Sequence, residues 1–299
     1  MNNKNIYFSI IFPTNNRAKD VQETLFYLNK STFKNFEVII IDNNSSDNTY
    51  EISKKYRFVK YIKNNYNAFV VKARNQAIKI ARGKIIFSID DDSFPSIHSL
   101  KIAHSIFEKY KDVAIISCGI KNYYTYKNQI LKKEDIKKIK DFTQTFTWSG
   151  CGGFIRKKFY NKYGPWDENG INCFYELLSC MWALKDKKKI INHENIYVFH
   201  KLSWGGKGGT IRSGNIMKND EFYSNSFIIL KYYEIFELIK KMSQLIYVIS
   251  LASIEQKTLV YFKSYLRLVI DLRKILKQKK TFPKHVTKKV RLSFNFIGK

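Results

Sequence analysis

Arginine and acidic residues are scarce in this sequence of 299 residues. Only nine of its 53 basic residues are Arg, and its 25 Asp and Glu leave a formal net charge of +28 at pH 7. A charge of this size suggests a polyanionic partner. However, Lys is a poor substitute for Arg in bidentate recognition of phosphates or bases, and no RNA- or DNA-binding motif is recognised. We therefore expect no nucleic acid among the partners of this protein.

Paired cysteines and long apolar runs are also lacking. The four cysteines, at positions 118, 151, 173 and 180, form no CxxC pair, which favours reduced thiols in a cytoplasmic protein. The apolar run near the N-terminus is too short for a signal peptide, and the run over residues 243–254 is shorter than the roughly 20 residues that cross a bilayer. We expect a cytoplasmic protein, either soluble or peripheral on the inner face of the plasma membrane.

Short apolar strands and amphipathic helices alternate over the first 120 residues. Strands are predicted over residues 6–12, 36–41, 58–62 and 84–89, and helices over residues 21–30, 48–56 and 70–82. The strands are apolar on both faces, and their alternation with helices predicts an α/β fold with a doubly wound, mostly parallel sheet flanked by helices. Hydrophobic residues make up 44% of the chain, which is enough to bury a sizeable core.

Three adjacent carboxylates, Asp90, Asp91 and Asp92, follow the last of these strands directly. They repel one another, so burying them is costly unless a cation offsets their charge, and Mg²⁺ and Mn²⁺ take such oxygen ligands. Residues 14–17 and 42–47 are also polar and follow earlier strands; ligands of open α/β sheets bind at the carboxyl ends of strands. The pattern predicts one crevice with a metal site. The alternative is a polar turn in which Asp92 or Ser93 caps the following helix.

Five segments together resemble family 2 glycosyltransferases with the GT-A fold. They are SIIFPTNNR (9–17), VIIIDNNSSDNT (38–49), NAFVVKARNQAIKIARGKIIFSIDDD (67–92), GCGGFIRKKFYNKYGPWDE (150–168) and YVFHK (197–201). They occur in the family's order and cover roughly residues 5–215. The resemblance implies an inverting enzyme that moves a sugar from a nucleotide diphosphate-sugar to a saccharide or lipid-linked acceptor in cell-surface glycan synthesis.

The resemblance also implies a donor site in the first half of the chain. Pro13, Thr14 and Arg17 match the first-strand motif that lines the nucleotide pocket. Asp42 matches the acidic residue that accepts a hydrogen bond from a pyrimidine, which favours UDP or dTDP over GDP; alternatively it is a turn-forming Asp. Arg74 matches the family's basic residue near the base or diphosphate.

The acidic triplet matches the DXD motif of the family. The match implies that Asp90 lies nearer the ribose and sugar and that Asp92 binds Mn²⁺ or Mg²⁺. Asp91 lies between them in the donor site, with its side chain expected to point elsewhere. His200 matches a late His that helps to hold the metal or the diphosphate, although a His after an aromatic strand is often structural.

Two loops match segments that lie near the sugars and the diphosphate. Gly152 and Gly153 match a loop that passes under donor and acceptor sugars, where small residues let the backbone approach a ligand closely. Trp166 either stacks on a sugar face or packs in the core. Lys207 or Arg212, in the Gly-rich stretch over residues 203–210 and just after it, would close over the diphosphate and exclude water, as lids do.

The catalytic base is where the sequence departs most from the family. The family usually supplies a carboxylate from a pair of acids at the start of a helix, and inverting transfer needs it to deprotonate the acceptor hydroxyl. Here Glu176 falls on the second acidic position, whereas Tyr175 replaces the first. Glu176 is therefore the candidate base, and Asp167 and Glu168 are the fallback.

The last segment of the chain is strongly basic. Residues 256–299 contain thirteen Lys or Arg and one acid, Asp271. Lys263, Arg267 and Lys274 fall on one helical face, next to an apolar face with Phe262 and other large residues. A basic amphipathic helix fits an anionic membrane surface, but the same stripe fits packing on the catalytic domain.

These observations predict a GT-A domain over residues 1–220 and a helical, basic region over residues 221–299. The nucleotide-sugar half of the domain is expected at about residues 1–120 and the acceptor half at about residues 121–220. Three other classes stay open on the residues alone. One is a catalytically inert binding relative, which the weakened base motif allows. A sugar-nucleotidyltransferase would normally have a Gly-rich N-terminal loop, which is missing here, and a basic nucleic-acid-binding protein is favoured only by charge and aromatic content.

Overall fold

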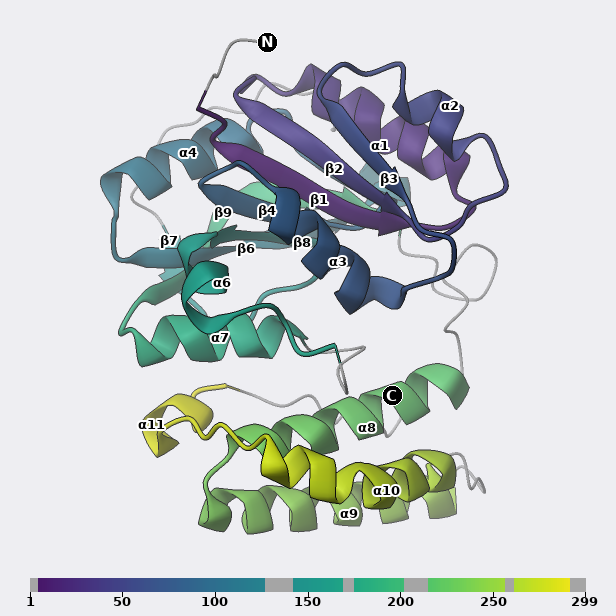
Figure 1. Ribbon diagram of the computed structural model, residues 1–299. Helices are drawn as coiled ribbons and strands as arrows, with labels where there is room; N and C mark the ends of the chain where they lie inside the picture. The colour runs from purple at the N-terminus through teal and green to yellow at the C-terminus, as the bar shows by residue number, and fades with distance from the viewer. Residues whose placement is uncertain (1–4, 127–141, 169–174, 202–214, 256–260, 291–299) are drawn as a thin grey trace. The chain divides into compact units, whose positions relative to one another are not determined.

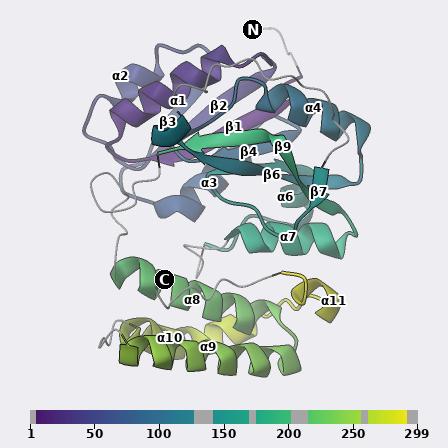
Figure 2. The ribbon, with the colours of Figure 1, turned by 180° about the vertical axis from the view of Figure 1, so that it is seen from behind.

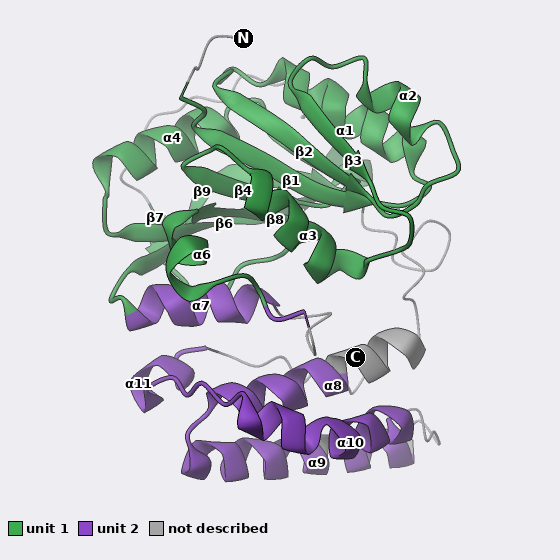
Figure 3. Ribbon diagram, viewed as in Figure 1, with its two compact units in different colours: residues 1–166, 186–202 green, residues 167–185, 203–299 purple. Residues whose placement is uncertain are grey.

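The computed structural model describes residues 5–126, 142–168, 175–201, 215–255 and 261–290. The chain divides into two compact units, drawn in two colours in Figure 3. The first comprises Met1–Trp166 and Asp186–Leu202, and the second comprises Asp167–Lys185 and Ser203–Lys299. The second unit thus includes the helix that carries Glu176 as well as the basic C-terminal region. The domain boundary near residue 220 stays a prediction.

A nine-stranded sheet forms the centre of the first unit, in the order β3-β2-β1-β4-β8-β6-β9-β5, with β7 paired to β9. The strands are β1 (Phe8–Thr14), β2 (Phe36–Asp42), β3 (Val59–Lys63), β4 (Ile85–Ile89), β5 (Ser93–Pro95), β6 (Val113–Asn122), β7 (Phe142–Gln144), β8 (Gly152–Arg156) and β9 (Lys189–His200). Strands β3, β2, β1 and β4 run parallel, whereas β8 is antiparallel to both β4 and β6. The predicted α/β fold with a mostly parallel sheet is confirmed.

Helices cover both faces of this sheet (Figures 1 and 2). They are α1 (Ala18–Lys30), α2 (Thr49–Ser53), α3 (Phe69–Ile80), α4 (Ser99–Lys109), α5 (Tyr123–Tyr126) and α6 (Lys158–Tyr163). Residues of α1 and α4 share one buried cluster with every second residue of β1 and β4, while α3 lies on the opposite face. Two covered faces explain why these strands are apolar along their whole length.

The predicted strands and helices of the first 90 residues are confirmed, with one informative shift. Helix α1 begins at Ala18 rather than at residue 21, because the Asp47 carboxylate accepts a hydrogen bond from the Ala18 N–H at 2.9 Å. The first N–H groups of a helix need acceptors from elsewhere. Asp47 supplies one from 29 positions away, so no local capping signal marks this start.

The second unit consists of helices: α7 (Tyr175–Lys185), α8 (Asn215–Tyr232), α9 (Ile235–Glu255), α10 (Phe262–Lys277) and α11 (Lys284–Thr287). Helix α8 packs against both α9 and α10. A buried ion pair joins Lys231 to Asp167, and the hydroxyl of Tyr232 lies 3.2 Å from the same carboxylate. In the part of the chain that the structure describes, no helix is long and apolar enough to cross a membrane.

Candidate active site

Three polar segments meet at the carboxyl ends of the parallel strands, as the sequence predicts. Thr14 at the end of β1 is in register with Asp42 at the end of β2. The side chain of Asn15 donates a hydrogen bond of 2.7 Å to the carbonyl of Asn43. The Thr14 hydroxyl donates to the Asp91 carboxylate at 2.8 Å. The polar edge expected here is therefore formed by residues at the ends of the first, second and fourth strands.

The acidic triplet is joined there by His200 from a distant strand. Strand β5 pairs antiparallel with β9, and this pairing sets Ser93 opposite His200. His200 Nε2 lies 3.1 Å from Asp92 Oδ1 and 3.9 Å from Asp90 Oδ2. One ligand atom from each of these three residues lies within 4.8 Å of the others. Asp90, Asp92 and His200 are called the metal cluster below.

Two arginines offset the negative charge of the metal cluster. Arg17 Nη2 lies 2.9 Å from Asp92 Oδ2, and Arg17 Nε lies 3.4 Å from Asp91 Oδ1. Arg74 is almost fully buried; it donates to Asp90 Oδ1 at 2.5 Å and also to the Ser88 hydroxyl. Each arginine therefore holds one carboxylate of the acidic triplet in place, and each lies at a position that the family resemblance implies.

The carboxylates of Asp91 and Asp92 differ in proton affinity. Burial raises the pKa of Asp91 to about 7, although the Arg17 guanidinium opposes the shift. Burial acts in the same direction on Asp92, but the hydrogen bond with His200 and the Arg17 guanidinium lower the pKa of Asp92 overall. The same carboxylates raise the pKa of Arg17, against the effect of its own burial. Asp92 is thus held as an anion between two cationic donors. A carboxylate must be deprotonated in this way to bind a metal.

The metal cluster fits a divalent cation. Two carboxylates and an imidazole are a common donor set, and Mg²⁺ or Mn²⁺ at such sites takes further oxygen ligands from phosphates and water. Burial lowers the pKa of His200, but its hydrogen bond to Asp92 and the neighbouring Cys151 raise it to about 11. His200 Nδ1 is buried and makes no hydrogen bond within the described residues. With this pKa the ring carries both protons in the metal-free protein, so it must release the Nε2 proton to bind the cation.

Asp42 is fully buried, and both of its carboxylate oxygens accept hydrogen bonds. Oδ1 accepts from the Ser45 N–H at 2.9 Å and from the Ser45 hydroxyl at 2.5 Å, and Oδ2 accepts from the hydroxyl of Tyr61. Burial and this carboxylate raise the pKa of Tyr61 well above its usual range. Asp42 therefore organises the turn after β2, as the structural alternative requires. A carboxylate offers about four lone-pair sites, so one remains for a ligand donor.

Comparison with known proteins assigns the family. The family model described as "Glycosyl transferase family 2" matches residues 9–164, which include the acidic triplet and both arginines. The chain belongs to glycosyl transferase family 2. Its fold is the GT-A fold that the resemblance implies. Membership of this family sets aside the nucleotidyltransferase and the nucleic-acid-binding protein that the residues alone left open.

Two relatives in the family carry printed activities. The chain is 32% identical over 125 residues to WfaP of Escherichia coli, a UDP-Glc:alpha-D-GlcNAc-diphosphoundecaprenol beta-1,3-glucosyltransferase; the match covers 41% of this chain and 48% of WfaP. It is 36% identical over 117 residues to TarS of Staphylococcus aureus, a poly(ribitol-phosphate) beta-N-acetylglucosaminyltransferase, covering 36% of this chain and 20% of TarS. The match therefore spans less than half the length of either relative.

Solved structures share the fold at low sequence identity. TarS 1-349 in complex with UDP-GlcNAc matches with a TM-score of 0.65 and 19% identity, over 95% of this chain and 84% of that chain. The mannosyltransferase PcManGT from Pyrobaculum calidifontis, in complex with GDP-Man and Mn²⁺, matches with a TM-score of 0.59 and 14% identity, over 92% of this chain and 84% of that chain. These likenesses support the GT-A architecture of the family.

The two glycines of the predicted sugar loop are required by packing inside the protein. A Cβ atom added to Gly153 would lie 2.1 Å from an indole carbon of Trp148, and one added to Gly152 would lie 2.9 Å from Val198. Trp166 is buried against Trp148 and Tyr160. Its backbone N–H and carbonyl are both hydrogen-bonded to the side-chain amide of Asn75 in α3. This packing supports the core role of Trp166 rather than stacking on a sugar.

The acceptor-side residues are less completely described. Glu176 lies in the first turn of α7, in the second unit, and its catalytic role stays a prediction. Of the fallback acids, Asp167 is held in a buried ion pair by Lys231, which argues for a structural role. Lys207 and Arg212 lie outside the described residues, so the predicted lid over the diphosphate is not described.

Sequence reasoning missed a charged network beside the metal cluster. The Lys201 N–H donates to the Asp92 carbonyl at 3.2 Å, and its ammonium lies 2.7 Å from Asp20 and 2.5 Å from Glu23. Asp20 also accepts from Arg17 at 2.9 Å. The three-residue spacing of Arg17, just before α1, and of Asp20 and Glu23 within it was a sequence pattern that could have indicated this network. Lys201, about 180 residues later, gave none.

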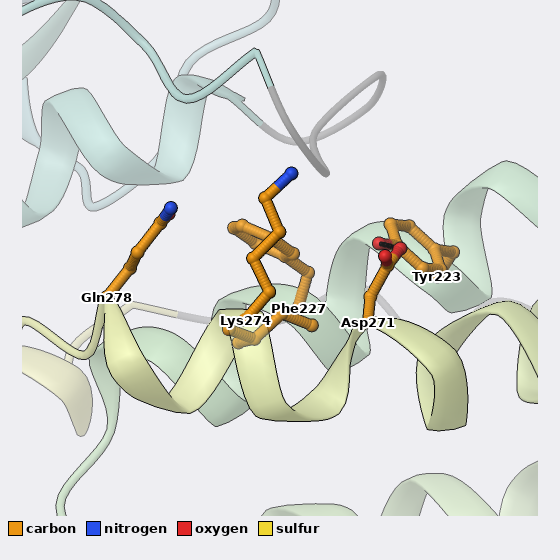
Figure 4. Close-up of a pocket in the computed structure, with 6 residues that line it drawn as sticks. Tyr223, Phe227, Asp271, Lys274 and Gln278 are labelled. Atoms are coloured by element: carbon orange, nitrogen blue, oxygen red, sulfur yellow. Dashed lines mark hydrogen bonds between the residues drawn. The ribbon is translucent and has the colours of Figure 1, made fainter.

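A small pocket lies elsewhere, between α8 and α10 of the second unit (Figure 4). Tyr223, Phe227, Asp271, Lys274, Ile275 and Gln278 line it. None of the predicted site residues is among them, and Asp271 is engaged there by the hydroxyl of Tyr223 at 2.5 Å. This pocket is a packing feature of the helical unit, separate from the metal cluster.

Proposed function

We propose that this protein is an inverting glycosyltransferase that moves a sugar from a nucleotide diphosphate-sugar to a saccharide or lipid-linked acceptor in cell-surface glycan synthesis. The observation that carries the proposal is the metal cluster at the carboxyl ends of the parallel strands. Family membership supports the reaction type, and the printed activities of WfaP and TarS are both glycosyl transfers.

Asp92 and His200, with Asp90 beside them, would hold Mn²⁺ or Mg²⁺. Such a cation supplies Lewis-acid stabilisation of the diphosphate leaving group. Arg74 keeps Asp90 oriented through its buried guanidinium, because it contacts both Asp90 and Ser88. Arg17 balances the charge of Asp92 and Asp91 beside the proposed cation site.

Asp42 would accept a hydrogen bond from a pyrimidine ring, which makes UDP or dTDP the proposed nucleotide. Its free lone-pair site lies on the oxygen that Tyr61 already contacts, so the base would bind beside that tyrosine. Pro13 and Thr14 at the end of β1 would line the same pocket. The structural neighbour with UDP-GlcNAc supports this choice, whereas the neighbour with GDP-Man shows that the fold itself accepts a purine.

Glu176 would take the proton from the acceptor hydroxyl as that oxygen attacks the anomeric carbon opposite the leaving group, which inverts the configuration. The acceptor of WfaP, a sugar on diphosphoundecaprenol, supports a lipid-linked acceptor here. An enzyme with such an acceptor would work in the cytoplasm at the inner face of the plasma membrane.

A thermal-shift screen tests the proposal most directly. The protein is heated with UDP-, dTDP- and GDP-sugars, with and without Mn²⁺, and donor hydrolysis is measured on the same panel. We expect UDP- or dTDP-sugars with Mn²⁺ to raise the melting temperature and to be hydrolysed slowly. A shift with a nucleotide triphosphate and none with any nucleotide-sugar would refute the proposed reaction.

A further inference from the structure

Helix α10 separates into two faces of opposite character. Ser264, Leu268 and Ile275 are buried on the face toward α8. The only acid of the helix, Asp271, is turned to the same side, where the Tyr223 hydroxyl donates to it at 2.5 Å (Figure 4). The one negative charge of α10 is therefore hydrogen-bonded within the helical unit.

The opposite face of α10 is apolar and exposed. Phe262, Leu266, Val269 and Ile270 follow the three- and four-residue spacing of one helical face, and each is at least half exposed; Ile270 reaches 72%. Single exposed apolar residues are normal on soluble proteins, but a contiguous face of this kind marks an interaction site. The apolar face predicted from the sequence is thus exposed rather than buried inside the protein.

Helix α9 has the same arrangement. Leu245 is fully buried, whereas the face opposite it carries Phe236, 81% exposed, and Ile254, 74% exposed. Ile239 and Tyr247 lie on the same exposed face at helical spacing. Because α9 and α10 both pack against α8 (Figures 1 and 2), the helical unit presents two exposed apolar helix faces. We name these two faces the α9/α10 surface.

Basic side chains border this surface. Residues 261–290 contain ten Lys or Arg and one acid, and that acid is Asp271, turned toward α8. Lys263 and Lys277 are exposed on α10 beside the apolar residues. Long basic side chains can place their alkyl stems along an apolar layer while their charges reach a polar boundary. A partner for this surface must therefore offer an apolar layer next to negative charge.

We propose that the α9/α10 surface lies in the interface of a lipid bilayer that contains anionic lipids, with both helices parallel to the membrane plane. Helices of this kind bury an apolar face at the boundary of headgroups and acyl chains, and each basic residue near anionic lipid adds to the affinity. A second copy of this chain would bring two basic surfaces together, so its charge opposes self-association. Nucleic acid would leave the apolar residues without a partner.

Vesicle flotation of the full chain tests this proposal independently of the transfer reaction. We expect binding to vesicles of phosphatidylcholine mixed with phosphatidylglycerol, weaker binding at high salt, and little binding to phosphatidylcholine alone. Ile270→Asp and Phe236→Asp should each weaken binding about tenfold or more, because each replaces an inserted apolar side chain by a charge. Phe26→Asp, at a residue of α1 that is 44% exposed, is the control on another element and should bind like the unchanged protein.

A second pair of variants separates charge from apolar contact. Changing both Lys263 and Lys277 to Gln should weaken binding to the anionic vesicles by about fivefold per charge. Changing both Lys101 and Lys109 of α4 to Gln removes the same charge elsewhere and should change little. All variants are expected to keep the melting temperature, since the substituted side chains are exposed.

Two outcomes would overturn the proposal. One is equal vesicle binding by Ile270→Asp, Phe236→Asp and the control Phe26→Asp. The other is a dimer of the unchanged protein, seen by sedimentation, that Ile270→Asp dissociates while no variant alters vesicle binding. If the unchanged protein hydrolyses no donor, that result would count against the proposed reaction only, because flotation does not depend on catalysis.

Discussion

Replacement of Asp92 by Asn is the sharpest test of the metal cluster. The carboxylate accepts from His200 Nε2 with one oxygen, at 3.1 Å, and from Arg17 Nη2 with the other, at 2.9 Å. The amide keeps one acceptor oxygen but sets an NH₂ group against the remaining donor. It also lacks the negative charge that a divalent cation needs from its ligand.

Two magnitudes follow from this geometry. A hydrogen bond to a charged group contributes about 1.5–3 kcal/mol, so the metal-free variant should lose about 2 kcal/mol of unfolding free energy. Relief of the repulsion between Asp91 and Asp92 offsets part of that loss. A ligand at 100 times its dissociation constant stabilises the unchanged protein by about 2.7 kcal/mol, which corresponds to roughly 5–10 °C in melting temperature for a domain of this size. Asp92→Asn should lose this Mn²⁺-dependent shift.

The assay is a melting curve with and without Mn²⁺ and donor, recorded for both Asp92→Asn and a control. Asp112→Asn removes an exposed carboxylate that pairs with Lys189, and pairs of this kind contribute little. The control should keep the full shift. A shift of unchanged size in Asp92→Asn would place the cation elsewhere, and an equal loss in Asp112→Asn would show that the effect is not specific to the cluster.

Three further variants test the remaining assignments. Glu176→Gln should keep donor affinity and lower the transfer rate by about 10²–10⁴-fold, the usual contribution of a general base; a near-normal turnover number would remove it from the mechanism. Arg74→Lys should weaken donor binding in calorimetry, because an ammonium lacks the planar fork that contacts both Asp90 and Ser88. Arg82→Lys, at an exposed position, is the control and should not weaken it. Equal donor affinities of the two variants would contradict the role proposed for Arg74. Gly153→Ala should lower the free energy of urea unfolding by about 1–3 kcal/mol, because its Cβ would lie 2.1 Å from an indole carbon of Trp148. Gly119→Ala is the control and should lower it much less, because the nearest atom to its Cβ is at 3.4 Å. Equal midpoints for the two glycine variants would refute the packing argument.

Local pattern was enough to predict the parallel half of the fold. Strands such as β2 are apolar at consecutive positions because helices cover both faces, and a continuous apolar run between helical patterns is readable without a structure. The donor-site edge followed from the same reasoning, since parallel strands end on one side. The meeting of Thr14, Asp42 and Asp91 at that edge needed only the strand order.

Contacts between distant segments could not be predicted in this way. The cap that Asp47 supplies to α1 and the ammonium of Lys201 beside Asp20 depend on how loops approach in space. The packing requirement at Gly153 was not predicted for the same reason, because nothing in the neighbouring sequence indicates that Trp148 fills the space beside it. His200 entered the prediction through family resemblance rather than through periodicity.

The late arrival of His200 has a consequence for how the protein is made. Strands β1 to β4 and the helices between them end at Ile89, so this edge of the sheet is synthesised well before His200. The metal cluster needs strand β9, whose last residue lies 108 positions beyond Asp92. Closing a loop of that length costs entropy, and the contacts that offset this cost form only when β9 pairs. The proposed cation site can therefore form only after β9 has been synthesised and has paired with the sheet.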